Sequence, residues 1–199
     1  NIIIMKNSNL VVVGGAGHIG LPLSILFSLK GFNVLAYDKS DKYFNVIRNG
    51  KMPYLEENGD NYLNSALKTK RLKFSTDLKD IKKDSNFIIT IGTPVDEFMN
   101  PTSKPIFQCI DDLLPYASDK SIMLLRSTVY PGTTDQIEDF IKKKKRKVKI
   151  AFCLERVVQG KTYSEIESLP QIIAYNDKSA KSLATKIFSK VSKKIIYCS

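Results

Sequence analysis

Short runs of consecutive apolar residues alternate along the chain with longer segments in which polar and apolar residues are mixed. The first kind predicts buried strands, and the second predicts helices with one apolar face. Strands are predicted at residues 9–14, 32–37, 72–75, 87–92, 121–125, 148–153, 170–175 and 194–198. Helices are predicted at residues 18–30, 41–48, 59–70, 103–116, 132–145 and 178–192, with a short helical stretch at 77–83.

The predicted strands are apolar along most of their length rather than at every second residue. Strands of this kind are buried on both faces, which is typical of a parallel sheet covered by helices on each side. A chain of 199 residues suits one domain with a substantial core. We therefore predict a single α/β domain over residues 1–199, with a doubly wound, mostly parallel sheet.

A glycine-rich turn joins the first predicted strand to the first predicted helix. Residues 15–20 read GAGHIG, with glycines in the GxGxxG spacing, and Asp38 ends the second predicted strand. In this order of strand, turn, helix, strand and acid, the spacing predicts a dinucleotide site. We expect Gly15 to allow the tight turn, Gly17 to admit a pyrophosphate to the backbone, and Gly20 to let helix and strand pack closely.

The cofactor expected at this turn is NAD, bound by a Rossmann fold. The N-terminus of the helix offers free N–H groups and a partial positive charge to the phosphates. Asp38 can accept hydrogen bonds from the adenosine ribose, and its carboxylate would repel the 2′-phosphate of NADP. His18 is expected to flank the cofactor as a loop residue, because backbone groups bind the phosphates.

The charge of the chain suggests a second hypothesis, a binding module without redox chemistry. The formal net charge is +11, and residues 142–147 read KKKKRK. A basic face can bind nucleic acid or another polyanion. We favour a solvated helix end and expect no nucleic-acid partner, because no aromatic residue interleaves with the run and cations stabilise a helix C-terminus.

The composition argues against a metal site and against a membrane-spanning segment. His18 is the only histidine, which argues against a histidine-based metal site. The three cysteines have no CxxC spacing and are expected to be free thiols in a reducing cytoplasm. No apolar run approaches the roughly 20 residues of a membrane span, and polar residues interrupt the start too soon for a secretion signal.

A third hypothesis is a short-chain dehydrogenase of the epimerase type. Its first turn is similar to GGAGHIG, and Tyr116 and Lys120 have the Tyr-x-x-x-Lys spacing of its catalytic pair. However, this pair precedes the fifth predicted strand, whereas it should lie in a helix after that strand. We therefore interpret the match as chance in a chain rich in tyrosine and lysine.

Four further stretches carry a resemblance to a known family. They are NGKMPYLEE at 49–57, GTPVDEFMNP at 92–101, STVYPGTT at 127–134 and CLERVVQGKTYSEIESLPQII at 153–173. In order and spacing, the chain resembles the UDP-glucose/GDP-mannose dehydrogenase family over almost its whole length. The resemblance implies oxidation of a sugar C6 alcohol to a carboxylate, with two hydride transfers to NAD.

Residues 154–156 indicate a branch of that family. They read Leu-Glu-Arg, which is similar to the Pro-Glu-Arg of UDP-N-acetylhexosamine dehydrogenases, such as those that act on UDP-N-acetylmannosamine. The UDP-glucose enzymes carry Pro-Glu-Phe there, and UDP-glucose is the alternative substrate. Leu154 departs from the proline of both branches.

The resemblance also implies roles for residues at the cofactor. His18 and Ile19 would contact the pyrophosphate through their backbone, and Asp38 would bind the ribose. Thr93 and Thr128 would border the cofactor at the ends of the fourth and fifth strands, where ligands bind in a doubly wound sheet. Thr128 would also place the catalytic water.

At the sugar, the resemblance assigns Glu155 to proton transfer and thioester hydrolysis, which suits a carboxylate near the nicotinamide. Arg156 and Val157 match positions that touch the UDP-sugar. Without the resemblance, Ser127 and Thr128 read as turn and cap residues for the next helix. Glu155 and Arg156 then read as a surface ion pair.

The nucleophile of the family is a cysteine in a Gly-Phe-Gly-Gly-x-Cys stretch, assisted by a lysine and an asparagine from a middle domain. None of Cys109, Cys153 and Cys198 stands in such a stretch. We therefore interpret the chain as the N-terminal NAD-binding part of a longer enzyme, expected to bind NAD and to be inactive alone. The resemblance implies a cytoplasmic homodimer that serves polysaccharide synthesis.

Overall fold

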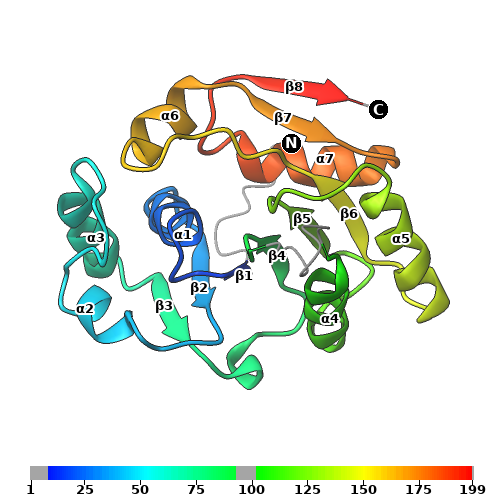
Figure 1. The fold of residues 1–199 in the computed structure, drawn as a ribbon, viewed down its shortest axis with the longest axis horizontal. Helices are drawn as coiled ribbons and strands as arrows, with labels where there is room; N and C mark the ends of the chain where they lie inside the picture. The colour runs from blue at the N-terminus through cyan, green and yellow to red at the C-terminus, as the bar shows by residue number, and fades with distance from the viewer. Residues whose placement is uncertain (1–8, 93–101, 199) are drawn as a thin grey trace.

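The computed structural model describes residues 9–92 and 102–198, which form one eight-stranded sheet with helices on both sides (Figure 1). The strand order is β3-β2-β1-β4-β5-β6-β7-β8. The strands are β1 (Asn9–Val13), β2 (Asn33–Tyr37), β3 (Leu72–Ser75), β4 (Asn86–Ile89), β5 (Ile122–Leu125), β6 (Lys149–Phe152), β7 (Gln171–Ala174) and β8 (Ile195–Cys198). All eight predicted strands are present, and the predicted doubly wound, mostly parallel sheet is confirmed.

The helices pack in two layers. They are α1 (Gly20–Leu29), α2 (Phe44–Arg48), α3 (Gly59–Lys68), α4 (Lys104–Leu113), α5 (Thr133–Lys143), α6 (Thr162–Ser168) and α7 (Lys178–Phe188), with 3₁₀ turns η1 (Leu78–Asp80) and η2 (Leu114–Tyr116). Successive side chains of a strand point to opposite faces. Leu10 and Val12 of β1 thus pack in one core with α1, α3 and α7, while Val11 and Val13 pack in another with α4 and α5. Burial on both faces explains why the strands read as continuous apolar runs.

The sheet is parallel from β3 to β6 and changes direction once. The pairs among β1 to β6 are all parallel. β6 meets β7 in antiparallel direction through the single pair Phe152–Ala174, and β8 then runs parallel to β7.

Several helical segments differ from the predicted ones: α7 ends at Phe188 rather than at residue 192, and the stretch predicted at 77–83 is only the 3₁₀ turn η1. The helix predicted at 103–116 ends as an α-helix at Leu113 and continues as η2, because Pro115 has no backbone N–H to donate to the preceding turn. The short helix α6 was not predicted, since its seven residues are too few to display a helical period. Within the described ranges, no helix combines the length and the apolar character needed to cross a membrane.

The strand order places a crevice at the carboxyl ends of β1 and β4. The chain leaves β1 toward β2 and β3 on one side, and β4 continues toward β5 and β6 on the other. Helices that follow these two strands cover opposite faces of the sheet, and ligands of doubly wound folds bind at this reversal point. The glycine-rich turn between β1 and α1 lies at that position.

Candidate functional site

The turn between β1 and α1 depends on glycines for two reasons. Gly14 has a φ of +82°, so the left-handed residue of the tight turn is Gly14, one position before the Gly15 to which we assigned the turn. A Cβ on Gly15 would lie 2.7 Å from the Cα of Ala36 in β2, and a Cβ on Gly20 would lie 2.1 Å from the Gly14 carbonyl oxygen. Gly15 therefore lets the turn approach β2, and Gly20 lets α1 approach the turn.

The backbone donors of the turn fall into two groups. The N–H groups of residues 14 and 15 both donate to the Tyr37 carbonyl at 2.9 Å. The N–H groups of His18, Ile19 and Gly20 have no acceptor within the described residues, as expected for donors at the start of a helix. Such free donors, together with the partial positive charge of the helix end, suit the phosphates of a dinucleotide.

Asp38 directly follows β2, and its carboxylate lies against the glycine turn. Oδ2 accepts a hydrogen bond from the Ala16 N–H at 3.1 Å, and Oδ1 accepts one from the Ser40 N–H at 3.2 Å. These two bonds hold the side chain beside the turn. The structure thus brings Asp38 and the free N–H groups together, while its contact with a ribose stays a prediction.

A cavity of about 420 Å³ adjoins this turn, at the carboxyl ends of β1, β2 and β4. Its lining is mixed, with apolar Leu78, Ile91 and Leu113 and polar Asp38, Thr90 and Gln108. Gly17 lines it as well, and a Cβ there would meet only the Gly14 carbonyl oxygen, at 3.2 Å. The size and lining are those of a small-molecule or cofactor site, so these residues fit a dinucleotide. Thr93, which we expected to border the cofactor, lies outside the described residues.

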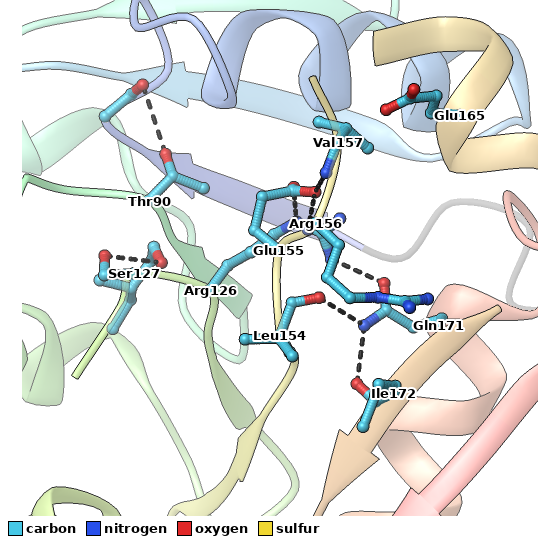
Figure 2. Close-up of polar contacts among 12 residues, drawn as sticks. Thr90, Arg126, Ser127, Leu154, Glu155, Arg156, Val157, Glu165, Gln171 and Ile172 are labelled. Carbon is cyan, nitrogen blue, oxygen red and sulfur yellow. Dashed lines mark hydrogen bonds and ion pairs between the residues drawn. The ribbon is translucent and has the colours of Figure 1, made fainter. Parts of the chain in front are cut away.

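Thr90 is a residue of this crevice that the sequence analysis missed. Its hydroxyl donates to the Val13 carbonyl at 2.7 Å and lies 3.4 Å from the Gly14 carbonyl oxygen. The bond to Val13 joins the ends of β1 and β4. Figure 2 labels Thr90 and marks a polar contact of its hydroxyl with a dashed line. A hydroxyl residue at the end of an otherwise apolar run was the only sequence signal.

A second polar cluster lies at the carboxyl ends of β5 and β6 (Figure 2). Oε1 of Glu155 accepts hydrogen bonds from the N–H groups of Arg156 at 2.8 Å and Val157 at 2.9 Å. Its Oε2 forms an ion pair with the guanidinium of Arg126. Arg126 also donates from Nη1 to Oε1 of Gln171 at 2.7 Å.

Arg126 is the member of this cluster that the sequence analysis missed. Its side chain is only 3% exposed, and that of Glu155 is 13% exposed. Three donors thus converge on a largely buried carboxylate and hold it in one orientation. The two residues lie 29 positions apart, so no local pattern could have paired them.

Two alternative interpretations of these motifs are not found in the structure. The Arg156 guanidinium donates to the Pro170 carbonyl at 2.5 Å and does not pair with Glu155. The Ser127 hydroxyl donates to the Ile91 carbonyl at 2.6 Å, which ties the end of β5 to the end of β4.

The remaining predicted residues at this rim are less enclosed. Helix α5 begins after Gly132 without a side-chain cap, so neither Ser127 nor Thr128 caps it. Thr128 is exposed, and Val157 is partly buried against the core. The roles assigned to Thr128, Arg156 and Val157 stay predictions.

His18 is exposed and contacts side chains outside the cavity. Its ring centroid lies 4.1 Å from that of Tyr54, and its Nδ1 lies 3.0 Å from Nε2 of Gln159. These contacts agree with its expected place as a loop residue beside the cofactor turn.

Two of the three cysteines, Cys109 and Cys153, are poor nucleophiles, while Cys198 is exposed at the end of β8. Cys109 lines the cavity and Cys153 follows β6, and both are buried. Burial raises the pKa of each thiol to about 12, so both keep their protons near neutral pH and react poorly. Among the residues of the described ranges, no group of three or more His, Cys, Asp or Glu side chains could hold a metal ion.

The basic run at 142–147 is partly used within the fold. Lys142 lies 3.7 Å from carboxylates of α5, and Lys144 pairs with Asp111 of α4 at 2.9 Å. Arg146 donates to the Leu114 carbonyl at 2.9 Å. These contacts agree with a helix end whose cations have structural partners.

Tyr116 ends η2 and precedes β5, so it lies at the amino end of that strand. The crevice lies at the carboxyl ends. This separation removes the geometric basis for a short-chain dehydrogenase pair of Tyr116 and Lys120.

Comparison with known proteins places the chain among sugar-nucleotide enzymes. The family model described as "UDP-glucose/GDP-mannose dehydrogenase family, NAD binding domain" matches residues 9–192. A UDP-N-acetyl-D-mannosamine dehydrogenase of Methanococcus vannielii is 31% identical over 191 residues, which cover 94% of this chain and 43% of the relative. A UDP-glucose 6-dehydrogenase of Rickettsia prowazekii is 27% identical, over 88% of this chain and 41% of the relative.

The fold agrees with a solved structure. The UDP-D-ManNAc dehydrogenase of Pyrococcus horikoshii superposes with a TM-score of 0.88 at 26% identity, covering 95% of this chain and 46% of that chain. The chain thus spans less than half the length of the relatives it matches.

Proposed function

This chain belongs to the UDP-glucose/GDP-mannose dehydrogenase family, and on that premise we propose that it is the NAD-binding part of a UDP-N-acetylhexosamine 6-dehydrogenase. The enzyme oxidises the C6 alcohol of its sugar to the uronate in two NAD-dependent steps. The observation that carries the proposal is the crevice, in which free N–H groups at the start of α1 adjoin the Asp38 carboxylate.

The residues of the crevice would hold NAD in a defined way. The N–H groups of His18, Ile19 and Gly20 would bind its phosphates. Gly17 would leave the backbone open to the phosphates, and Gly15 would keep the turn close to β2. Asp38 would accept hydrogen bonds from the adenosine ribose. The 2′-phosphate of NADP would place a second negative charge beside this carboxylate. Because that is unfavourable, the site favours NAD over NADP. When bound, NAD supplies the hydride acceptor for both oxidations.

Glu155 is the residue of this chain that would move protons during the reaction. Its carboxylate is fixed by Arg126 and by two backbone N–H groups at the carboxyl end of the sheet. General acid–base groups act when they are held within hydrogen-bond reach of the reacting atoms. Thr128 would border the cofactor and place the water, and Arg156 and Val157 would contact the UDP-sugar.

The choice of sugar rests on similarity. The chain carries Glu-Arg at 155–156, and UDP-N-acetyl-D-mannosamine dehydrogenases are among its most similar relatives. These two points support UDP-N-acetylmannosamine. UDP-glucose is the second candidate, because UDP-glucose 6-dehydrogenases are also similar to this chain over 88% of its length.

We further propose a cytoplasmic homodimer without a nucleic-acid partner, acting in polysaccharide synthesis. The free, buried thiols of Cys109 and Cys153 suit a reducing compartment. The partners found for the basic run support the absence of a nucleic-acid role.

A chimera tests the enzymatic part of the proposal. In it, this chain replaces the matching segment of the Pyrococcus horikoshii dehydrogenase, and NADH formation from UDP-N-acetylmannosamine is measured. We expect turnover, and we expect Glu155→Gln to lower it by about 10²- to 10⁴-fold, because a positioned acid–base group contributes that much. A chimera that binds NAD and turns over equally fast with Glu155→Gln contradicts the role of Glu155.

A further inference from the structure

The connection between α2 and α3 reaches the glycine turn through one tyrosine. The Tyr54 hydroxyl donates to the Gly17 carbonyl at 2.7 Å, across 37 positions of sequence. Burial, reinforced by the nearby Tyr163 and Glu56, raises the pKa of Tyr54 far above its ordinary value. The hydroxyl therefore keeps its proton and remains a donor over the whole physiological pH range.

This bond acts on the peptide unit that joins Gly17 to His18. The Gly17 carbonyl also accepts the Leu21 N–H at 3.0 Å, in the first turn of α1. In a planar trans peptide, the C=O and the N–H point in opposite directions. Two donors on the Gly17 oxygen therefore fix the direction of the His18 N–H, one of the free donors that we assign to the phosphates.

A second contact holds the side chain of the same turn. The His18 ring packs against the Tyr54 ring at a centroid distance of 4.1 Å, and its Nδ1 lies 3.0 Å from Nε2 of Gln159. When the Gln159 amide donates to Nδ1, the ring proton is on Nε2. The turn is thus held in place both through its backbone and through the side chain of His18.

The two segments that hold the turn, the connection with Tyr54 and the loop with Gln159, are hydrogen-bonded to each other. Glu56 is 8% exposed, and its carboxylate accepts the Thr162 N–H at 2.6 Å and the Thr162 hydroxyl at 2.9 Å. The Glu57 N–H donates to the Gly160 carbonyl at 2.9 Å. Hydrogen bonds to a buried charge are costly to break. They fix the connection that carries Tyr54 against the loop that carries Gln159.

We propose that Tyr54 is a positioning residue for the dinucleotide phosphates, and that Gln159 joins the same turn to the loop that carries Glu155. The inference rests on the proposed binding of NAD in this crevice. Neither side chain needs to touch the cofactor. Loss of the Tyr54 hydroxyl would leave the Gly17 carbonyl with the Leu21 N–H as its donor, so the Gly17–His18 peptide would be held less firmly, and the adenosine contacts would be unchanged.

The test is an NMR titration of the ¹⁵N-labelled chain with NAD and, separately, with adenosine, which lacks phosphates. We expect Tyr54→Phe to raise the Kd for NAD by about 2- to 10-fold, the effect of one hydrogen bond, and to leave the Kd for adenosine unchanged. We also expect it to move the His18 amide signal of the free protein. Gln159→Leu should raise the Kd for NAD by a smaller factor.

Tyr43→Phe is the matched control, because it removes an exposed hydroxyl next to the start of α2. It should change neither Kd. Equal NAD binding by the unmodified chain and Tyr54→Phe overturns the role of Tyr54, and equal binding by Gln159→Leu overturns that of Gln159. A matching loss of adenosine affinity in Tyr54→Phe also overturns it, since a general loosening of the fold would weaken both ligands. If the unmodified chain binds no NAD, the proposed function itself fails.

Discussion

At the scale of single residues, Gly15 and Gly17 stand two positions apart in one turn and face different surroundings. A Cβ on Gly15 would lie within 2.8 Å of three atoms of Ala36, two of them backbone atoms of β2. A Cβ on Gly17 would lie 3.2 Å from a single backbone oxygen and would occupy the wall of the cavity. One glycine therefore serves the packing of the fold, and the other serves access to the ligand.

Alanine at each position should separate these two roles. We expect Gly15→Ala to lower the free energy of unfolding by about 1–3 kcal/mol, because the methyl group overpacks the contact with β2. Gly17→Ala should change stability by less than about 1 kcal/mol and weaken NAD binding instead. Urea unfolding and NAD titration of both variants measure this. Loss of stability in Gly17→Ala comparable to that in Gly15→Ala would contradict the distinction.

Much of the turn could be predicted from local sequence. Gly15, Gly17, Gly20 and Asp38 were identified because glycine spacing and a strand-ending acid are local signals. The left-handed conformation of Gly14 was not assigned, since two adjacent glycines both permit it and only the approach to β2 distinguishes them.

At the scale of elements, Arg126 links three parts of the sheet edge. It follows β5, pairs with Glu155 after β6, and donates to Gln171 at the start of β7. Because β6 and β7 share only one residue pair, this side chain is a major polar connection between them. Its guanidinium also lies 5.2 Å from the ring centroid of Phe188 in α7.

Removal of the Arg126 charge should lower the free energy of unfolding by more than the loss of a surface ion pair would. We expect Arg126→Met to lower the free energy of unfolding by about 3–5 kcal/mol, because it leaves a largely buried carboxylate without its partner. Adding Glu155→Gln to Arg126→Met should recover part of the loss. Urea unfolding of the single and double variants gives the coupling energy. A loss below about 1 kcal/mol for Arg126→Met would show that the pair is not buried in solution.

Elements were predicted better than the contacts between them. The eight strands were predicted correctly because both faces of the sheet are buried, and such strands consist of consecutive apolar residues. The pairs Arg126–Glu155 and Tyr54–Gly17 were not found, because residues 29 and 37 positions apart meet only after the sheet has formed.

At the scale of the whole molecule, the strand order explains why the chemistry gathers at one edge of the sheet. The glycine turn, Asp38, Thr90, Arg126 and Glu155 all lie at or just beyond the carboxyl ends of strands. Parallel strands bring these ends together although they are far apart in sequence. The chain spans 43% of the Methanococcus vannielii relative, and NAD binding is the part of the proposed reaction that we assign to it.

The central claim is that the crevice binds NAD through free N–H groups and the Asp38 carboxylate. The most direct test is calorimetric titration of this chain with NAD and with NADP, repeated with Asp38→Ala. We predict that NAD binds at least about tenfold more tightly than NADP, because like charges at close range are costly, and that Asp38→Ala weakens NAD binding and narrows this difference. Absence of heat with both dinucleotides, tighter binding of NADP, or unchanged NAD binding by Asp38→Ala would contradict the account.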